Sequence, residues 1–148
     1  MIERFEKFTG AVFDITRYWH KIASEEMEKY GLKGSYAIYL TTLYRSPEGI
    51  SAMDLCRLCG KDKADVSRMV NIMAEKELVI KEGNFYRARI KLTHTGKMAA
   101  EQVSKRAALA VEIAGSGVSE EDREIFYNVL LSIASNLQNL SEDGLPEE

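Results

Sequence analysis

The segment between Ser51 and Leu92 most constrains what this chain can fold into. Ser51 can cap a short helix that ends at Gly60, a residue suited to the left-handed conformation found where helices end. Asp62 can cap a second helix, whose apolar residues recur at helical spacing. Over residues 87–92 the apolar residues instead alternate with basic ones, as they do in a strand. The segment therefore predicts two helices joined by a glycine-containing turn and followed by a small β-hairpin.

The hairpin is predicted to carry basic side chains on one face. A two-residue turn at Gly83-Asn84 would connect its strands. Ala88, Ile90 and Leu92 would share the apolar face. The opposite, basic face consists of Arg87, Arg89 and Lys91. The second helix is predicted to bury Val66, Met69, Val70 and Met73. Two helices and a basic hairpin in this order form the winged helix-turn-helix arrangement.

Long amphipathic helices flank this middle segment. Apolar residues at spacings of three and four between Phe5 and Ile22 predict one helix that stops near Gly31. Ser35 could cap a short helix that follows it. An alanine-rich helix and a last helix capped by Ser119 complete the chain. Because little else could cover the apolar seams of the terminal helices, we expect them to be buried in a homodimer.

The fold class expected is mainly α with a minor β part. We expect a single domain over residues 1–148, in which residues 35–93 form the winged helix-turn-helix lobe. Residues 1–31 and 95–140 would form the dimerisation region, and residues 141–148 a disordered tail.

Charge is distributed unevenly along the chain. The net charge is −3, yet residues 57–97 hold ten basic and five acidic residues, a balance of +5, and the remainder carries −8. A basic module between acidic flanks suits a protein in which one part faces phosphates. A chance excess of charge on solvated faces is the alternative interpretation.

The N-terminal helix interleaves charged and apolar residues, so it lacks the uninterrupted apolar run of a signal peptide or membrane span. We therefore expect a cytoplasmic protein with no membrane partner. Two cysteines are too few for a disulfide scaffold.

Four short motifs, in this order and spacing, resemble the MarR family of transcription regulators. They are Leu55-Cys56-Arg57-Leu58-Cys59-Gly60, Val66-Ser67-Arg68, Glu77-Leu78-Val79 and Leu92-Thr93-His94-Thr95-Gly96. The resemblance covers nearly the whole chain and implies a homodimeric repressor that binds a pseudo-palindromic double-stranded operator. It also implies release from DNA by a small phenolic or amphipathic effector.

The second helix of the lobe would be the recognition helix in the major groove. Its outward residues and the basic face of the hairpin supply donors suited to base edges and phosphates, and the start of the first lobe helix favours phosphate. The predicted DNA-binding residues are Ser51, Lys63, Ser67, Arg68, Asn71, Arg87, Arg89 and Lys91. The hairpin is shorter than the family pattern and lacks its aspartate-arginine pair, for which Glu82 could substitute by orienting a recognition-helix arginine.

The resemblance also implies an effector cleft between the dimerisation helices and the lobe. The side chains best suited to line it are Tyr18, Trp19, His20, Tyr36 and Tyr39. Plain core packing is the alternative interpretation of these aromatic residues.

Cys56 and Cys59 admit two interpretations. In the family pattern they replace a small buried residue and a buried leucine, so both would pack in the core of the lobe. Alternatively, the two cysteines form a redox- or metal-responsive switch. A further alternative for the chain as a whole is a winged-helix module that binds another protein. No catalytic set, phosphate loop or metal-ligand spacing is present in the sequence, so we expect no enzyme activity, cofactor or metal.

Overall fold

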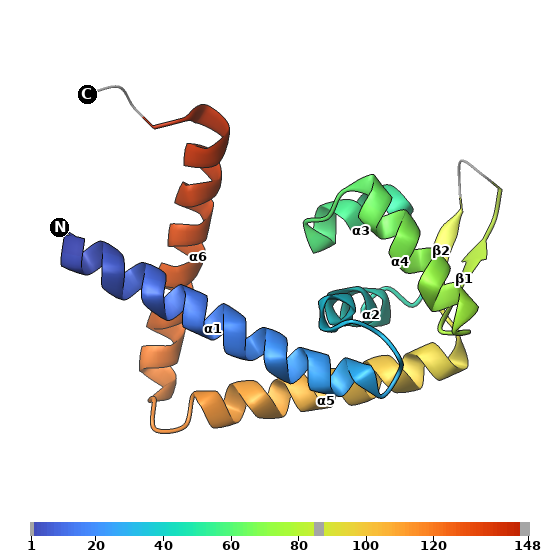
Figure 1. Cartoon of the computed structure of the whole chain (residues 1–148), viewed down its shortest axis with the longest axis horizontal. Helices are drawn as coiled ribbons and strands as arrows, with labels where there is room; N and C mark the ends of the chain where they lie inside the picture. Colours follow the sequence, from blue (N-terminus) through green and yellow to red (C-terminus); the bar gives the residue numbers. More distant parts are fainter. Residues whose placement is uncertain (1, 85–87, 146–148) are drawn as a thin grey trace. The chain divides into compact units, whose positions relative to one another are not determined.

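The computed structural model describes residues 2–84 and 88–145 and divides the chain into two compact units, one ending at Ala108 and one beginning at Leu109 (Figure 1). The predicted fold class is confirmed: the described chain is mainly helical, with one two-stranded antiparallel sheet. The elements are α1 Ile2–Glu28, η1 Gly34–Tyr36, α2 Ala37–Tyr44, α3 Ala52–Cys59, α4 Lys63–Glu75, β1 Val79–Glu82, β2 Arg89–Leu92, α5 His94–Ala114 and α6 Glu120–Asp143.

The helix boundaries of the lobe follow from local caps. The hydroxyl of Ser51 accepts a hydrogen bond from the amide of Asp54 at 3.1 Å, and the carboxylate of Asp62 accepts one from the amide of Asp65 at 2.8 Å. Gly60 ends α3 in the left-handed conformation, with φ of 61°. These three predictions are confirmed, because each depends on residues within one turn of the cap.

The predicted cap at Ser35 is wrong. Ser35 lies inside the 3-10 turn η1, and no side chain caps α2. The backbone at Gly34 instead packs closely against α1: a Cβ atom added to Gly34 would lie only 2.8 Å from the amide nitrogen of Ser24. A tertiary contact, rather than a local hydrogen bond, fixes this helix start.

The core of the lobe gathers apolar side chains from α2, α3, α4 and the sheet. The predicted buried face of α4 is confirmed, since Val66, Met69, Val70 and Met73 are all buried. Cys59 is buried as expected, whereas Cys56 is half-buried and packs against the edge of the core. This core leaves the opposite face of α4 to solvent.

The predicted two-residue hairpin turn at Gly83-Asn84 is also wrong. Glu82 pairs with Arg89 and Val79 with Leu92, so the connection spans residues 83–88, of which 85–87 lie outside the described residues. Ala88 therefore precedes β2 rather than belonging to it. The register places Val79, Ile90 and Leu92 in the core, and the burial of these three side chains outweighs the local turn preference.

One compact joint connects the end of α4, β2 and the start of α5. The hydroxyl of Thr93 donates to the carbonyl of Glu77 at 2.6 Å and accepts from the amide of Gly96 at 3.0 Å. A Cβ atom on Gly96 would lie 1.9 Å from the carbonyl oxygen of Leu78, so only glycine allows this approach. The Leu92 to Gly96 motif thus holds the start of α5 against the link between α4 and β1.

Both terminal helices leave apolar seams exposed. In α1 the exposed apolar residues include Phe5, Phe13, Ile15, Tyr18 and Ile22, and α6 has no buried residue. The helix α6 continues to Asp143, three residues into the expected tail, and residues 146–148 lie outside the described part. No helix among the described residues is long and apolar enough to cross a membrane.

Candidate nucleic-acid interface

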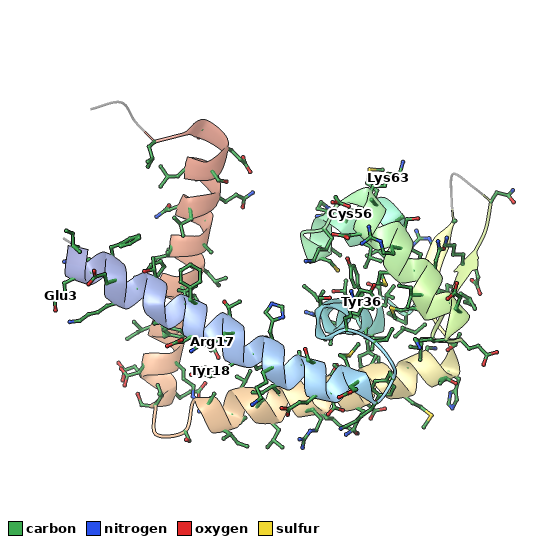
Figure 2. The ribbon with its side chains drawn as sticks, viewed as in Figure 1. Glu3, Arg17, Tyr18, Tyr36, Cys56 and Lys63 are labelled. Atoms are coloured by element: carbon green, nitrogen blue, oxygen red, sulfur yellow. The ribbon has the colours of Figure 1, made fainter. Side chains whose placement is uncertain are left out.

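The exposed face of α4 presents the predicted recognition residues. Lys63, Ser67 and Asn71 are four residues apart, so they lie along one face of the helix, and all three are exposed. Arg68 lies beside this row and is exposed as well. Figure 2 shows Lys63 at the beginning of α4, on the outside of the lobe. The helix thus offers an ammonium, a hydroxyl, a guanidinium and an amide, which are the groups that bind base edges and phosphates.

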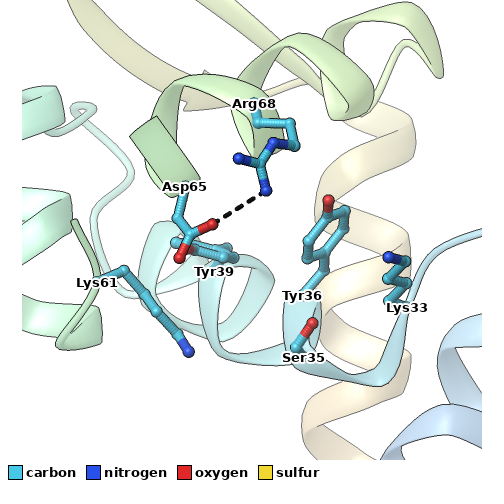
Figure 3. A pocket seen from close by; sticks show the side chains of 7 residues that line it. All are labelled: Lys33, Ser35, Tyr36, Tyr39, Lys61, Asp65 and Arg68. Atoms are coloured by element: carbon cyan, nitrogen blue, oxygen red, sulfur yellow. Dashed lines mark hydrogen bonds and ion pairs between the residues drawn. The ribbon is translucent and has the colours of Figure 1, made fainter. Parts of the chain in front are cut away.

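The guanidinium of Arg68 is held by its own helix. Its Nη1 atom lies 3.2 Å from Oδ1 of Asp65, one turn earlier. Figure 3 shows this pair at the wall of a cavity between η1, α2 and α4. The pair is exposed, so it restrains the arginine without neutralising it in a dry environment.

Ser51 is occupied by its capping role. Its hydroxyl donates to Oδ2 of Asp54 at 2.8 Å in addition to accepting from the amide of the same residue. The hydrogen bond from Ser51 and the neighbouring Arg57 lower the pKa of the Asp54 carboxyl, which is therefore charged at neutral pH. A phosphate at the start of α3 would meet this carboxylate, so any contact there falls to backbone amides rather than to the hydroxyl of Ser51.

The basic residues of the hairpin are partly engaged within the chain. Nη1 of Arg89 donates to the carbonyl oxygen of Gly49 at 2.8 Å, and Nζ of Lys91 lies 2.7 Å from Oε2 of Glu82. Glu82, a candidate partner for a recognition-helix arginine by sequence, pairs with Lys91 of the adjacent strand, and no ion pair joins it to an arginine of α4 among the described residues. Arg87 lies outside the described residues.

The structure separates the predicted effector-binding residues into two groups. Tyr18, Trp19 and His20 are exposed on α1, where Arg17 donates a hydrogen bond to the Tyr18 hydroxyl at 3.1 Å (Figure 2). Tyr36 and Tyr39 instead meet edge to face, with ring centroids 6.1 Å apart, at the cavity beside α4 (Figure 3).

Sequence reasoning missed the polar residues of that cavity. Lys33, Ser35, Lys61 and Asp65 line it together with Tyr36, Tyr39 and Arg68. Lys33 precedes η1 and Lys61 lies in the turn before α4, and no local pattern connects two residues so far apart in the sequence. Only the packing of α2 against the helix-turn-helix brings them together.

Burial raises the pKa of the Cys59 thiol, and its sulfur lies 3.6 Å from the Thr42 hydroxyl oxygen inside the lobe. A raised pKa leaves less thiolate, the reactive form, at neutral pH. No group of three or more His, Cys, Asp or Glu side chains that could hold a metal ion occurs in ranges 2–84 and 88–145. The interior position of Cys59 favours the core-packing interpretation over the switch.

The comparison with protein families identifies most of the winged helix-turn-helix lobe. Residues 30–84 match the model of the MarR family. The search of curated proteins found no match. Among solved structures, a MarR transcriptional regulator from Methanosarcina mazei is 24% identical, with a TM-score of 0.78 over 91% of this chain and 92% of that one. The MepR-DNA complex of S. aureus superposes with a TM-score of 0.79 at 19% identity, over 87% of this chain and 97% of that one. At these identities the structural likeness shows a shared fold and nothing further.

Proposed function

We propose that this chain is a member of the MarR family and a sequence-specific DNA-binding transcription regulator; the family model over residues 30–84 and the shared fold of the solved structures support this. One observation carries the proposal: α4 buries one face in the lobe core and exposes Lys63, Ser67, Arg68 and Asn71 on the other. A helix held in this way presents a rigid row of donors to the major groove. The MepR structure supports the same use of the fold, because it is a complex with DNA.

The hairpin and the start of α3 would position the lobe on the duplex. Arg89 and Lys91 would contact phosphates, as would Arg87 and the amides that follow Ser51. Such contacts set the orientation of the recognition helix without reading sequence. Base recognition would thus depend on α4 alone.

The regulator would act as a cytoplasmic homodimer and repressor. The exposed apolar seams of α1 and α6 support this, since a large apolar surface is stable in water only when a partner covers it. A two-fold dimer would bind a pseudo-palindrome with half-sites about one helical turn apart. A small effector that prefers the form unable to bind DNA would release the operator by shifting the population of the dimer.

The test is selection of bound duplexes from fragmented DNA of the source genome, at two salt concentrations. We expect one inverted repeat to be enriched and to survive the higher salt, because base contacts depend less on counterion release than phosphate contacts do. The double variant Ser67→Ala/Arg68→Ala is the control and should lose this enrichment. Absence of any enriched repeat with the unmodified chain would overturn the proposal.

A further inference from the structure

The cavity beside the recognition helix has the size of a compact ligand. Its volume is about 210 Å³. Pockets that hold drug-sized molecules range from about 300 to 1,000 Å³. Its walls come from the segment before α2, from α2 itself, from the turn after α3 and from the first two turns of α4. A small molecule, rather than a large hydrophobic one, matches this space.

The charges at the cavity wall favour an anion. Lys33, Lys61 and Arg68 line it, and Asp65 is the one acidic residue that does so, which leaves a balance of +2. Asp65 pairs with Arg68. Within the described part of the chain, no carboxylate lies within ion-pair distance of Lys33 or Lys61, although four other lysines do have such partners. Two exposed lysines thus line the cavity without a counterion from the described residues.

Hydroxyl groups add further donors. Ser35 and Tyr36 line the cavity, and neither side chain forms a hydrogen bond to another described residue. Burial is the main cause that raises the pKa of Tyr39 to about 12, so its hydroxyl remains protonated at neutral pH. Figure 3 shows Lys61, Asp65 and Arg68 on one side of the cavity and Ser35 and Tyr36 on the other. The cavity wall thus combines three cations and three hydroxyl donors with a single anionic group, Asp65.

We propose that this cavity binds inorganic phosphate or a small phosphate monoester as a dianion. A phosphate monoester carries a charge of about −1.5 to −2 near neutral pH and three strong acceptor oxygens. Arginine and lysine are the side chains that proteins use for this group. The dianion would offset the +2 balance and accept hydrogen bonds from the hydroxyl groups. A monoanion would leave one of the cations uncompensated.

Phosphate in the cavity would compete with Asp65 for Arg68. Because Arg68 is also a proposed base-reading residue, the bound dianion would hold its guanidinium in the cavity wall and away from the duplex. Phosphate would therefore weaken specific DNA binding more than non-specific binding. This consequence rests on the proposed function, whereas the binding of phosphate does not.

The experiment is calorimetric titration of the full chain without DNA, at constant ionic strength, with inorganic phosphate and with glycerol phosphate. The variants Lys33→Gln and Lys61→Gln should each bind about tenfold more weakly, as expected for loss of one charge-assisted contact. Lys97→Gln is the matched control, because Lys97 is an exposed lysine of α5 away from the cavity. It should bind like the unmodified chain. Equal unfolding temperatures without ligand would show that all three variants fold.

Two comparison ligands sharpen the test. Dimethyl phosphate, a monoanion like the DNA backbone, should bind at least tenfold more weakly than the monoester. Equal binding would overturn the proposal and assign these lysines to duplex phosphates. Benzoate is the second comparison ligand. If benzoate binds in a manner that depends on Lys33 and Lys61 and phosphate does not bind, the cavity takes a carboxylate and the proposed ligand class is wrong. Equal affinity of the unmodified chain and all three variants for phosphate would contradict a phosphate site in this cavity. A heat signal that depends only on ionic strength would contradict it as well. A failed duplex selection would leave the titration unaffected, so the two proposals fail separately.

Discussion

At residue 68 the proposed base-reading side chain is fixed by a neighbour on the same helix. The Arg68–Asp65 pair spans 3.2 Å, and the Arg57–Asp54 pair repeats the same spacing on α3 at 3.4 Å. Two arginines with the same kind of partner therefore lie on two different helices of the lobe. They make a matched pair for separating base recognition from general surface charge.

We expect Arg68→Ala to weaken binding to the selected operator by about 1–3 kcal/mol, because a base contact of an arginine contributes that much discrimination. Binding to a scrambled duplex should change much less. Arg57→Ala should leave the operator preference intact. Fluorescence anisotropy with both duplexes measures the ratio, and an unchanged ratio for Arg68→Ala would refute its assignment.

The two cysteines should differ in reactivity. Burial raises the pKa of the Cys59 thiol, so at any pH below that value the thiolate fraction is smaller than in the unfolded chain. We expect iodoacetamide at pH 7.5 to alkylate the half-buried Cys56 well before Cys59, and the rate at Cys59 to rise only at more alkaline pH. Peptide mass spectrometry measures both rates. In urea the alkylation rates of the two cysteines should become equal. Rapid alkylation of Cys59 in the native chain would contradict this prediction and favour the redox-switch interpretation.

Among the elements, the link between α4 and β1 contains an unusual backbone conformation. Glu77 has φ of 58°, a region that residues other than glycine rarely adopt. The carbonyl of Glu77 is fixed there by the hydroxyl of Thr93. The joint at Thr93 and Gly96 thus holds a residue that is not suited to this conformation.

We expect Glu77→Gly to raise the free energy of unfolding by about 1 kcal/mol, because glycine removes the left-handed strain and this gain exceeds its cost in chain entropy. Urea unfolding measures the change. Ala74→Gly, an exposed position three residues earlier in α4, should lower the free energy by about the same amount. If both substitutions destabilise the chain equally, the strain at Glu77 is absent.

The hairpin should contribute to DNA binding through charge alone. Lys91→Ala should weaken binding to every duplex alike and reduce the slope of log affinity against log salt by about one. The hydrogen bond with Glu82 raises the pKa of Lys91, so the lysine stays charged and this slope should not change between pH 6 and 9. Glu82→Ala, which frees Lys91, should strengthen binding to all duplexes. Loss of sequence preference in Lys91→Ala would contradict this role.

The elements also show what sequence could and could not predict. The caps at Ser51, Asp62 and Ser119 were predictable because each hydrogen bond closes within three residues. The start of α2 and the length of the hairpin connection were not, since contacts with Ser24 and the burial of Ile90 decide them. The cavity was equally hidden, because its lysines come from separate turns.

At the scale of the whole molecule, the two terminal helices leave many large apolar side chains exposed, and the proposed homodimer would cover them. If the proposed homodimer forms through the exposed seam of α1, we expect Ile15→Glu to convert it to monomer at micromolar concentration and to abolish operator binding. Lys21→Glu, an exposed polar position on the same helix, is the control and should leave the dimer intact. Sedimentation velocity measures the assembly. A dimeric Ile15→Glu would show that this seam serves another purpose.

The close approach of Gly96 to Leu78 leaves no room for the start of α5 to move toward the link between α4 and β1. A Cβ atom does not fit between Gly96, at the start of α5, and the carbonyl of Leu78, in the link between α4 and β1, and the hydroxyl of Thr93 binds both segments. We therefore expect a displacement of the first turn of α5 to be passed on to the hairpin and to the link that follows the recognition helix. A movement of α5 would thus reach the recognition helix α4 and the hairpin through the first turn of α5.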